Sequence, residues 1–453
     1  MSWLPSDKWL KKAVIIGALL RLVPVCIWIY WPCVRDECTY LRLAERMVAG
    51  EGMTASNGWI WAPGYPALVA LHEALFTNGM IIKGTQVIAS MYIIVLMFRL
   101  GARLFSPRAG YVAAWLYALS PTQIFFAQSL WSECLYGGLL LLAVWAFEHS
   151  SDQQSSSKPW VNRLPMVAWT GILLGGCVLF RGVATYMLPI FMGALLWGRL
   201  RQRAAWKQAL VLCVATMLTV APYSLYASSK FGTFMISDRT LGQMMWLGNN
   251  DFKPVTFDWG NGQLSGREFK RHTSTGRKPC GSKKKPVERD QCQTSAGVDW
   301  IKNNPDEFAR RMPLRVAQMI NPHSFLTRHI RWGEWQGLPR LLDESLIVLN
   351  VLWNCIVLIG GSVGLCLYGR RRSAVLIAGI LLYHIAAISV LAGLTRYRVP
   401  LEPLLMLYVG GFFVEDKLSP SRWRWFGCAT VLAFLLPLMA WFFPTAWVGW
   451  RHW

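Results

Sequence analysis

Long apolar runs recur along the whole chain, separated by short polar connections. A helix needs about 20 mainly apolar residues to cross the hydrocarbon layer of a bilayer, and on this criterion the runs predict about eleven transmembrane helices. They lie at residues 13–31, 80–98, 109–127, 129–147, 164–180, 183–198, 207–227, 342–367, 373–392, 402–415 and 425–444. The first run carries Arg21 and Pro24 and has no small-residue cleavage site, so we expect a retained span rather than a signal peptide.

Lys and Arg are concentrated in every second connection between these runs. The basic connections carry Lys8, Lys11 and Lys12; Arg99, Arg103 and Arg108; Lys158 and Arg163; Arg199, Arg201, Arg203 and Lys207; Arg370 to Arg372; and Lys417, Arg422 and Arg424. Cytoplasmic loops retain Lys and Arg, so the alternation predicts that the N-terminus is inside. Residues 32–79 and 229–341 and the turn TRYRVPLEP at 395–403 then face the outer compartment.

The first outer region, residues 32–79, has the pattern of two short helices. Four polar residues recur at i, i+4, i+7 and i+11, which places them on one helix face. They are Arg35, Thr39, Arg42 and Arg46. We expect this amphipathic helix to lie in the membrane interface with its apolar side toward the bilayer, and to end at GEG, residues 50–52. The turn APGYP at 62–66 precedes a second helix over ALVALHEALF at 67–76.

The second large outer region divides the chain into three parts, residues 1–228, 229–341 and 342–453. Its middle, residues 266–292, is basic and rich in Gly, Pro and Ser, so we expect it to be mobile. Its end, residues 296–322, has a helical pattern. The apolar set of that pattern is Trp300, Ile301, Phe308, Met312, Val316 and Ile320.

The composition excludes a soluble globular protein, because 54% of the 453 residues are hydrophobic and only 15% are charged. A net charge of +22 is compatible with nucleic-acid binding, but in a polytopic membrane protein it reports orientation instead. We therefore predict an all-α polytopic membrane protein. We expect it to interact with the lipid bilayer and not with nucleic acid, and we expect it to be a monomer.

Four of the 11 cysteines lie in the predicted outer regions, and the other seven lie within the apolar runs. An oxidising compartment allows a bridge between Cys280 and Cys292, but one sequence does not establish the pairing. Cys33 and Cys38 are a weaker pair, because five residues at the start of a helix is an awkward separation for disulfide geometry.

Two adjacent acids, Asp36 and Glu37, follow the first apolar run, and Glu133 begins the fourth at the same predicted face. One interpretation is structural, because an acid at a helix N-terminus meets free N–H groups and the positive end of the helix dipole. The other is catalytic. An acid where a span meets the outer face can take a proton from a hydroxyl nucleophile, and a second acid can orient that nucleophile or bind a divalent ion.

Four cations are predicted at the same face, namely Lys83, Arg181, Arg396 and Arg398. Each can extend toward lipid headgroups, which is the usual role of such residues at span ends. Together with the acid pair, they are also suited to bind a phosphate, for which arginine offers bidentate geometry.

These residues, in this order, resemble the GT-C superfamily of integral-membrane glycosyltransferases, in particular the protein O-mannosyltransferases and the lipid A aminoarabinose transferase. The acid-containing first outer region is the specific part of the resemblance, and the other stretches support it. The stretches are RDECTYLRLAERMVAGEG, WAPGYPALVALHEALF, SLWSECLY, GGCVLFRGVATYMLPI, LGNN at 247–250 and RYRVPLEPLL.

The resemblance implies a hexosyl- or pentosyltransferase with a polyprenyl-phosphate-linked sugar as donor and an inverting displacement onto a hydroxyl of a lipid, glycan or protein. Asp36 would be the general base, with Glu37 and Glu133 as supporting acids. The lipid phosphate would be held by Lys83, Arg181, Arg396 and Arg398, and Tyr40 and Tyr397 would complete the substrate site. Mg²⁺ or Mn²⁺ is the candidate cofactor, with Asp36 and Glu133 as its candidate ligands.

Two departures from the family pattern bear on the substrate. The extended Arg-Tyr-Asp-Glu motif of the aminoarabinose enzyme is missing, which leaves that sugar unsupported. Residues 229–341 are too few for the soluble insert with a repeated β-fold of the protein mannosyltransferases, which argues against protein mannosylation.

Two other functions remain open. A lipid-linked sugar flippase or transporter typically has inverted repeats and charges at mid-membrane, whereas these charges lie at span ends and no repeat is visible. A surface-polysaccharide polymerase or ligase uses similar donors and is not distinguished by the sequence.

We expect a bacterial inner membrane with the site facing the periplasm. The alternative is the endoplasmic reticulum, for which no retention signal or glycosylation sequon is present.

Overall fold

The computed structural model describes residues 7–28, 33–34, 36–54, 60–150, 164–251, 280, 285–331, 339–369, 372–414 and 422–440. In these ranges the regular structure is helical, apart from isolated β-bridges that join Ile60 to Thr54 and to Arg239. The first helices are α1 (Lys8–Trp28), α2 (Asp36–Val48), α3 (Gly64–Phe76), η1 (Gly79–Ile81), α4 (Ile82–Leu104), α5 (Pro107–Leu119), α6 (Pro121–Gln128) and α7 (Glu133–Ser150). Next come α8 (Leu164–Phe180), η3 (Gly182–Met187), α9 (Leu188–Leu196), α10 (Arg203–Phe231), α11 (Leu241–Gly248), α13 (Pro286–Asn303), α14 (Pro305–Met319) and α15 (Phe325–Arg331). The last are α16 (Arg340–Cys355), η4 (Ile356–Gly360), α17 (Gly361–Tyr368), α18 (Arg372–Val390), η5 (Thr395–Leu401), α19 (Glu402–Val414) and α20 (Arg422–Ala440).

The predicted all-α membrane architecture is confirmed. Four described helical segments are long and apolar enough to cross a bilayer, namely Gly79–Leu104, Arg203–Phe231, Arg340–Tyr368 and Arg372–Val390. Helices α6 and α7 meet this criterion together, but they are bent by 114°. The predicted number of eleven spans is not confirmed, because the described helices over the other apolar runs do not meet the combined criterion of length, hydropathy and low charge. Residues 29–31, 415 and 441–444 of the predicted spans lie outside the described residues.

One predicted span, residues 109–127, is wrong as a single helix. Helix α5 ends at Leu119, and Ser120 is extended with a ψ of 116°. The residue before a proline is disfavoured in the helical conformation, so Pro121 forces the break. The Ser120 hydroxyl then accepts from Gln123 N at 3.3 Å and caps α6. This short helix leads the chain to the turn before α7.

Helix α19 lies at the centre of the bundle, and every residue from Glu402 to Gly411 is buried. It packs against α4, α5, α7 and α17, and η5 leads directly into it. Next to it, α4 and α5 cross so closely that a Cβ on Gly110 would lie 2.5 Å from the Phe98 carbonyl oxygen. Small residues permit such close helix approach inside membranes. The buried centre gives η5 a rigid attachment.

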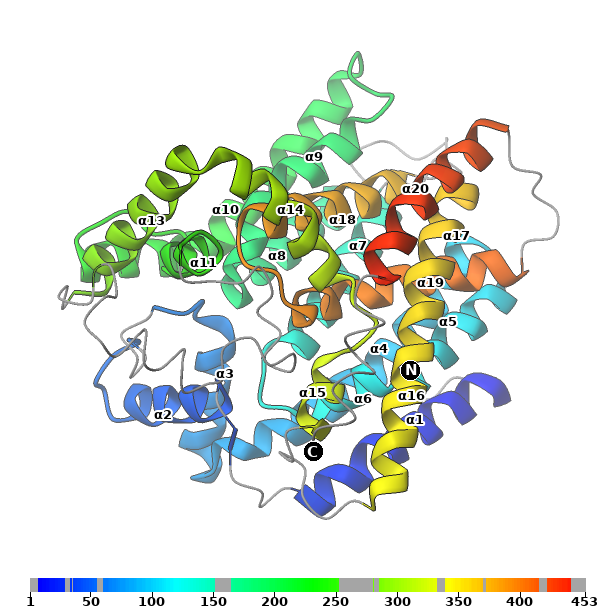
Figure 1. Ribbon diagram of the computed structural model, residues 1–453, viewed down its shortest axis with the longest axis horizontal. Coiled ribbons are helices and arrows are strands. Elements are labelled where there is room, and N and C mark those ends of the chain that lie inside the picture. Colours follow the sequence, from blue (N-terminus) through cyan, green and yellow to red (C-terminus); the bar gives the residue numbers. More distant parts are fainter. Residues whose placement is uncertain are drawn as a thin grey trace.

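The two helices predicted in the first outer region are confirmed as α2 and α3, which lie together below α11 and α13 in Figure 1. Helix α2 ends where Gly50 and Gly52 adopt positive φ angles of 76° and 95°. Its apolar side chains Tyr40, Leu43 and Ala44 are buried within the protein, because α2 packs on α3. The apolar side of α2 is therefore covered by protein rather than directed toward lipid.

The end of the second outer region forms α13 and α14, as the helical pattern predicts. The expectation that residues 266–292 are mobile is wrong for its last part, since residues 286–292 form the start of α13, where Asp290 accepts from Gly242 N at 2.7 Å. The segments 266–279 and 281–284 lie outside the described residues. Cys280 and Cys292 form a disulfide, which settles the pairing that the sequence leaves open.

Candidate active site

Three segments that are distant in the sequence bring two acids and an arginine into contact. Asp36 is the first residue of α2, Glu133 is the first residue of α7, and Arg396 lies in η5. Arg396 Nη1 donates to Asp36 Oδ2 at 2.6 Å, and Arg396 Nε donates to Glu133 Oε1 at 2.6 Å. One guanidinium group therefore bridges two carboxylates that the sequence predicts at the same face.

A second arginine, Arg181, joins the same group. It follows α8, and its Nη1 lies 2.6 Å from Glu133 Oε1 and donates to Ser132 Oγ at 3.4 Å. Glu133 Oε1 thus accepts from both arginines. We refer to Asp36, Glu133, Arg181 and Arg396 as the acid–arginine cluster.

Asp36 is the solvent-exposed acid of this cluster. Its side chain is 41% exposed, whereas that of Glu133 is fully buried and that of Arg396 is 12% exposed. Burial by itself lowers the pKa of Arg396 and of Arg181, but Glu133 outweighs this effect in both, with help from Asp36 at Arg396. The pKa of Arg396 therefore lies well above its ordinary value and that of Arg181 lies above it, so both remain charged.

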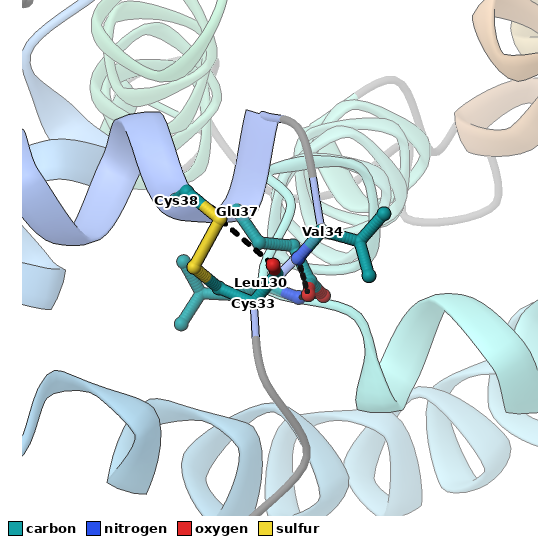
Figure 2. Close-up of a disulfide and its surroundings, with 5 residues drawn as sticks. All are labelled: Cys33, Val34, Glu37, Cys38 and Leu130. Carbon is teal, nitrogen blue, oxygen red and sulfur yellow. Dashed lines mark hydrogen bonds between the residues drawn. A yellow bond between two sulfur atoms is a disulfide. The ribbon is translucent and has the colours of Figure 1, made fainter. Parts of the chain in front are cut away.

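Glu37 joins the two acid-bearing segments instead of facing the exposed side of the cluster. Its Oε2 accepts from Val34 N at 3.1 Å, and its Oε1 accepts from Leu130 N at 2.7 Å (Figure 2). Leu130 lies in the turn before Glu133. Glu37 therefore fixes the start of α2 relative to the start of α7, and both of its oxygens are used in doing so.

A disulfide joins Cys33 to Cys38 (Figure 2). Asp36 and Glu37 lie between the two cysteines in the sequence and are therefore enclosed in the disulfide loop. The two Cα atoms are 5.1 Å apart, within the usual range for a disulfide. The expectation that this spacing is awkward is therefore wrong. Cys33 and Val34 are not helical, and Glu37 N donates to Val34 O at 3.0 Å, so the chain turns back across the first turn of α2.

Lys83 and the two predicted tyrosines lie close to these groups. Lys83 is buried on α4 and interacts electrostatically with Glu37. Tyr40 is buried on α2 and interacts electrostatically with the acid–arginine cluster, while the Tyr397 ring lies 5.9 Å from the Arg181 guanidinium carbon. Burial raises the pKa of both tyrosines, so each is a neutral hydrogen-bonding group at neutral pH.

Arg398 is not brought to the acid–arginine cluster. Its Nε donates to Glu402 Oε1 at 3.0 Å, and its Nη1 donates to the carbonyl oxygens of Met319 and Asn321. The Arg398 and Glu402 side chains are each 2% exposed, so they form a buried ion pair. This pair attaches η5 and α19 to the end of α14.

Two aromatic residues that the sequence does not single out support Arg396. Its guanidinium carbon lies 5.1 Å from the Trp131 ring centre and 5.9 Å from the Phe325 ring centre. Aromatic faces attract cations, and such contacts hold a guanidinium in one orientation. Trp131 lies in the stretch SLWSECLY, where only its proximity to Glu133 could have indicated this role; nothing around Phe325 in the sequence does so.

The residues present do not fit a metal ion bound between Asp36 and Glu133, which are the predicted ligands. Within the part of the chain that the structure describes, no group of three His, Cys, Asp or Glu side chains is arranged to hold one. The space between the two carboxylates is taken by the guanidinium of Arg396. Glu37, the acid that follows Asp36 in the sequence, uses both oxygens on backbone N–H groups.

No family model matches the chain, and no curated protein sequence matches it. A solved structure of the Archaeoglobus fulgidus oligosaccharyltransferase, in complex with Zn and sulfate, matches with a TM-score of 0.52 and 14% identity. The match covers 96% of this chain and 52% of that one. Archaeal oligosaccharyltransferase AglB from the same organism, in complex with an inhibitory peptide and a dolichol-phosphate, matches with a TM-score of 0.51 and 16% identity over 95% and 54% of the two chains.

The fold of the chain is similar to that of these two structures. It spans about half the length of these two structures. ArnT from Cupriavidus metallidurans, bound to undecaprenyl phosphate, is also similar, with a TM-score of 0.45 and 12% identity over 91% of this chain and 79% of that one. Within this fold, the acid–arginine cluster is assembled by the starts of α2 and α7, by η5 and by Arg181, which follows α8.

Proposed function

We propose that the protein is a membrane glycosyltransferase that moves a sugar from a polyprenyl-phosphate donor to a hydroxyl group of an acceptor at the outer face. The observation that carries the proposal is Asp36, an exposed carboxylate held by Arg396 at the edge of a buried ion-paired cluster. The resemblance to the GT-C superfamily supports it, as does the dolichol-phosphate bound to the similar archaeal structure.

Asp36 acts as the general base in this proposal. Arg396 holds one of its oxygens, Oδ2, and no described residue donates a hydrogen bond to Oδ1. Oδ1 takes the proton of the acceptor hydroxyl as the hydroxyl oxygen attacks the anomeric carbon. The bond from that carbon to the phosphate oxygen breaks, polyprenyl phosphate leaves with the electron pair, and the anomeric configuration inverts. A positioned base contributes roughly 10²–10⁴-fold to such a step.

The arginines stabilise the departing phosphate. Arg396 uses Nε and Nη1 on the two carboxylates, so Nη2 remains for a phosphate oxygen. Arg181 contributes a second guanidinium, and Lys83 contributes positive charge from α4. Donors fixed at a developing negative charge supply about 3–4 kcal/mol each in a site that excludes water. Arg398 has its structural role in the pair with Glu402, so we assign it no contact with the phosphate.

The outer face is proposed to be the periplasmic side of a bacterial inner membrane. Two disulfides support an oxidising compartment, because cytosolic thiols are kept reduced. One of them encloses Asp36, so the proposed site and the oxidising side coincide. The alternation of basic connections in the sequence supports the same orientation.

The test uses purified protein in liposomes with a panel of polyprenyl-phosphate sugars and a crude envelope extract as the source of acceptor. Mass spectrometry follows the released polyprenyl phosphate for the wild type, for Asp36→Asn and for Glu45→Gln, which changes an exposed acid on the same helix. We expect release by the wild type and by Glu45→Gln and its loss in Asp36→Asn. If no donor releases polyprenyl phosphate and labelled lipid crosses the bilayer instead, the protein is a flippase.

A further inference from the structure

Arg396 lies between the carboxylates of Asp36 and Glu133, an arrangement that would also suit a metal cation. Its two contacts to Asp36 and Glu133 are both 2.6 Å long and come from different nitrogens of the same planar group. A divalent ion in such a place would fix the two acids relative to each other and attract a phosphate. A guanidinium performs the first task through its fixed fork of N–H donors and the second through its charge.

The charges around this position are balanced without any further cation. The acids Asp36, Glu37 and Glu133 face three cations, Lys83, Arg181 and Arg396. A divalent ion added to this group would leave two positive charges without partners in surroundings that are largely buried, which is costly. The ion would also have to displace Arg396 from its contacts with Trp131 and Phe325.

The remaining carboxylate oxygen in the buried part of the cluster does not offer an alternative position. Glu133 Oε2 is buried and has no hydrogen-bond partner among the described residues. It has no solvent-accessible surface at which a hydrated ion could arrive, and a metal there would lack further protein ligands among the described acids. The bridging position of Arg396 is therefore the place where a cation and the arginine would compete.

We propose that Arg396 takes the place of a divalent metal ion in this site, so that the transfer proceeds without one. Arg396 aligns Asp36 with Glu133 and presents Nη2 to the phosphate of the donor. This inference rests on the proposed function for its catalytic part, but the competition between arginine and metal is a property of the site itself. It can therefore be measured without any sugar transfer.

The experiment measures Mn²⁺ binding to the purified full-length protein by electron paramagnetic resonance. We expect no Mn²⁺ bound at this site in the wild type. Arg396→Ala removes the cation between Asp36 and Glu133, while Arg181 still pairs with Glu133. We expect this variant to bind one Mn²⁺ that is lost again in Arg396→Ala/Glu133→Gln. The control is Arg46→Ala, which removes the arginine from an exposed pair with Glu51 and should create no Mn²⁺ site.

Two results would overturn the inference. One is a Mn²⁺ ion bound by the wild type and lost in Glu133→Gln, and the other is a folded Arg396→Ala protein that binds none. Should Arg396→Ala not fold, the wild-type measurement still decides, together with polyprenyl phosphate release in EDTA, which we expect to be unchanged; a loss restored by Mn²⁺ contradicts the inference. A protein that transfers no sugar but follows the Mn²⁺ pattern refutes the proposed function alone.

Discussion

The disulfide between Cys33 and Cys38 offers a sharp test of how Asp36 is positioned. Replacing both cysteines by serine removes the only covalent link across the start of α2 among the described residues, while the hydrogen bonds of Glu37 remain. We expect the variant to fold, because the buried side of α2 is unchanged. We also expect it to transfer sugar more slowly, because Asp36 must then be ordered in every catalytic cycle.

The expected decrease in the transfer rate can be calculated from the size of the disulfide loop. The linked cysteines are 5 residues apart in the sequence, and closing a loop that short removes roughly 2 kcal/mol of chain entropy. If the variant has to order this segment again before it reaches the transition state, the full entropy cost is added to the barrier. The rate of sugar transfer then falls by about 30-fold. The contacts of Asp36 with Arg396 and of Glu37 with Leu130 retain part of the order, so 30-fold is an upper limit.

The assay is the rate of polyprenyl phosphate release, with the Cys280→Ser/Cys292→Ser variant as the matched control. That pair is also a disulfide of the outer region, but it links residue 280 to α13 and encloses no residue of the acid–arginine cluster. We expect the control to keep the wild-type rate. A wild-type rate in the Cys33→Ser/Cys38→Ser variant, or an equal loss in both variants, would refute the reasoning.

Two further predictions concern stability. Glu402→Ala leaves Arg398 buried without its carboxylate and should lower the free energy of unfolding by about 3–5 kcal/mol, whereas Glu344→Ala, which breaks the exposed pair with Arg340, should cost at most about 1 kcal/mol. Thermal unfolding in detergent measures both, and equal midpoints would contradict the buried-pair argument. Gly110→Val should cost about 1–3 kcal/mol or more, because its side chain meets the backbone of α4. An unchanged unfolding midpoint would show that the two helices can separate at little cost.

The helical nature of the chain and the grouping of its acids and arginines could be predicted from the sequence, because both depend on local patterns. Apolar runs indicate helices, and the distribution of Lys and Arg indicates the face on which the remaining charges lie. The eleven spans could not be confirmed in the same way. A serine followed by a proline, as at Ser120, divides an apolar run without changing its average hydrophobicity.

The different roles of Arg396 and Arg398 could not be predicted, since the sequence presents them as equivalent. They lie in a 3₁₀ helix, which has about three residues per turn, so residues two apart point in different directions. Arg396 reaches Asp36 and Glu133, while Arg398 reaches Glu402. The bridging of two acids by one guanidinium depends on segments far apart in the chain, and no local pattern indicates it.

The measurement that tests the central claim most directly is a single-turnover experiment on Asp36→Asn. It follows the rate of sugar transfer and, on the same samples, the binding of polyprenyl phosphate. The account predicts a rate that is roughly 10²–10⁴-fold lower, because the proton acceptor is lost. It predicts unchanged lipid-phosphate binding, because the Asn oxygen can still accept from Arg396, and both arginines keep Glu133 as their charged partner. A rate equal to that of the wild type, with the lipid phosphate still bound, would contradict the assignment of Asp36 as the base.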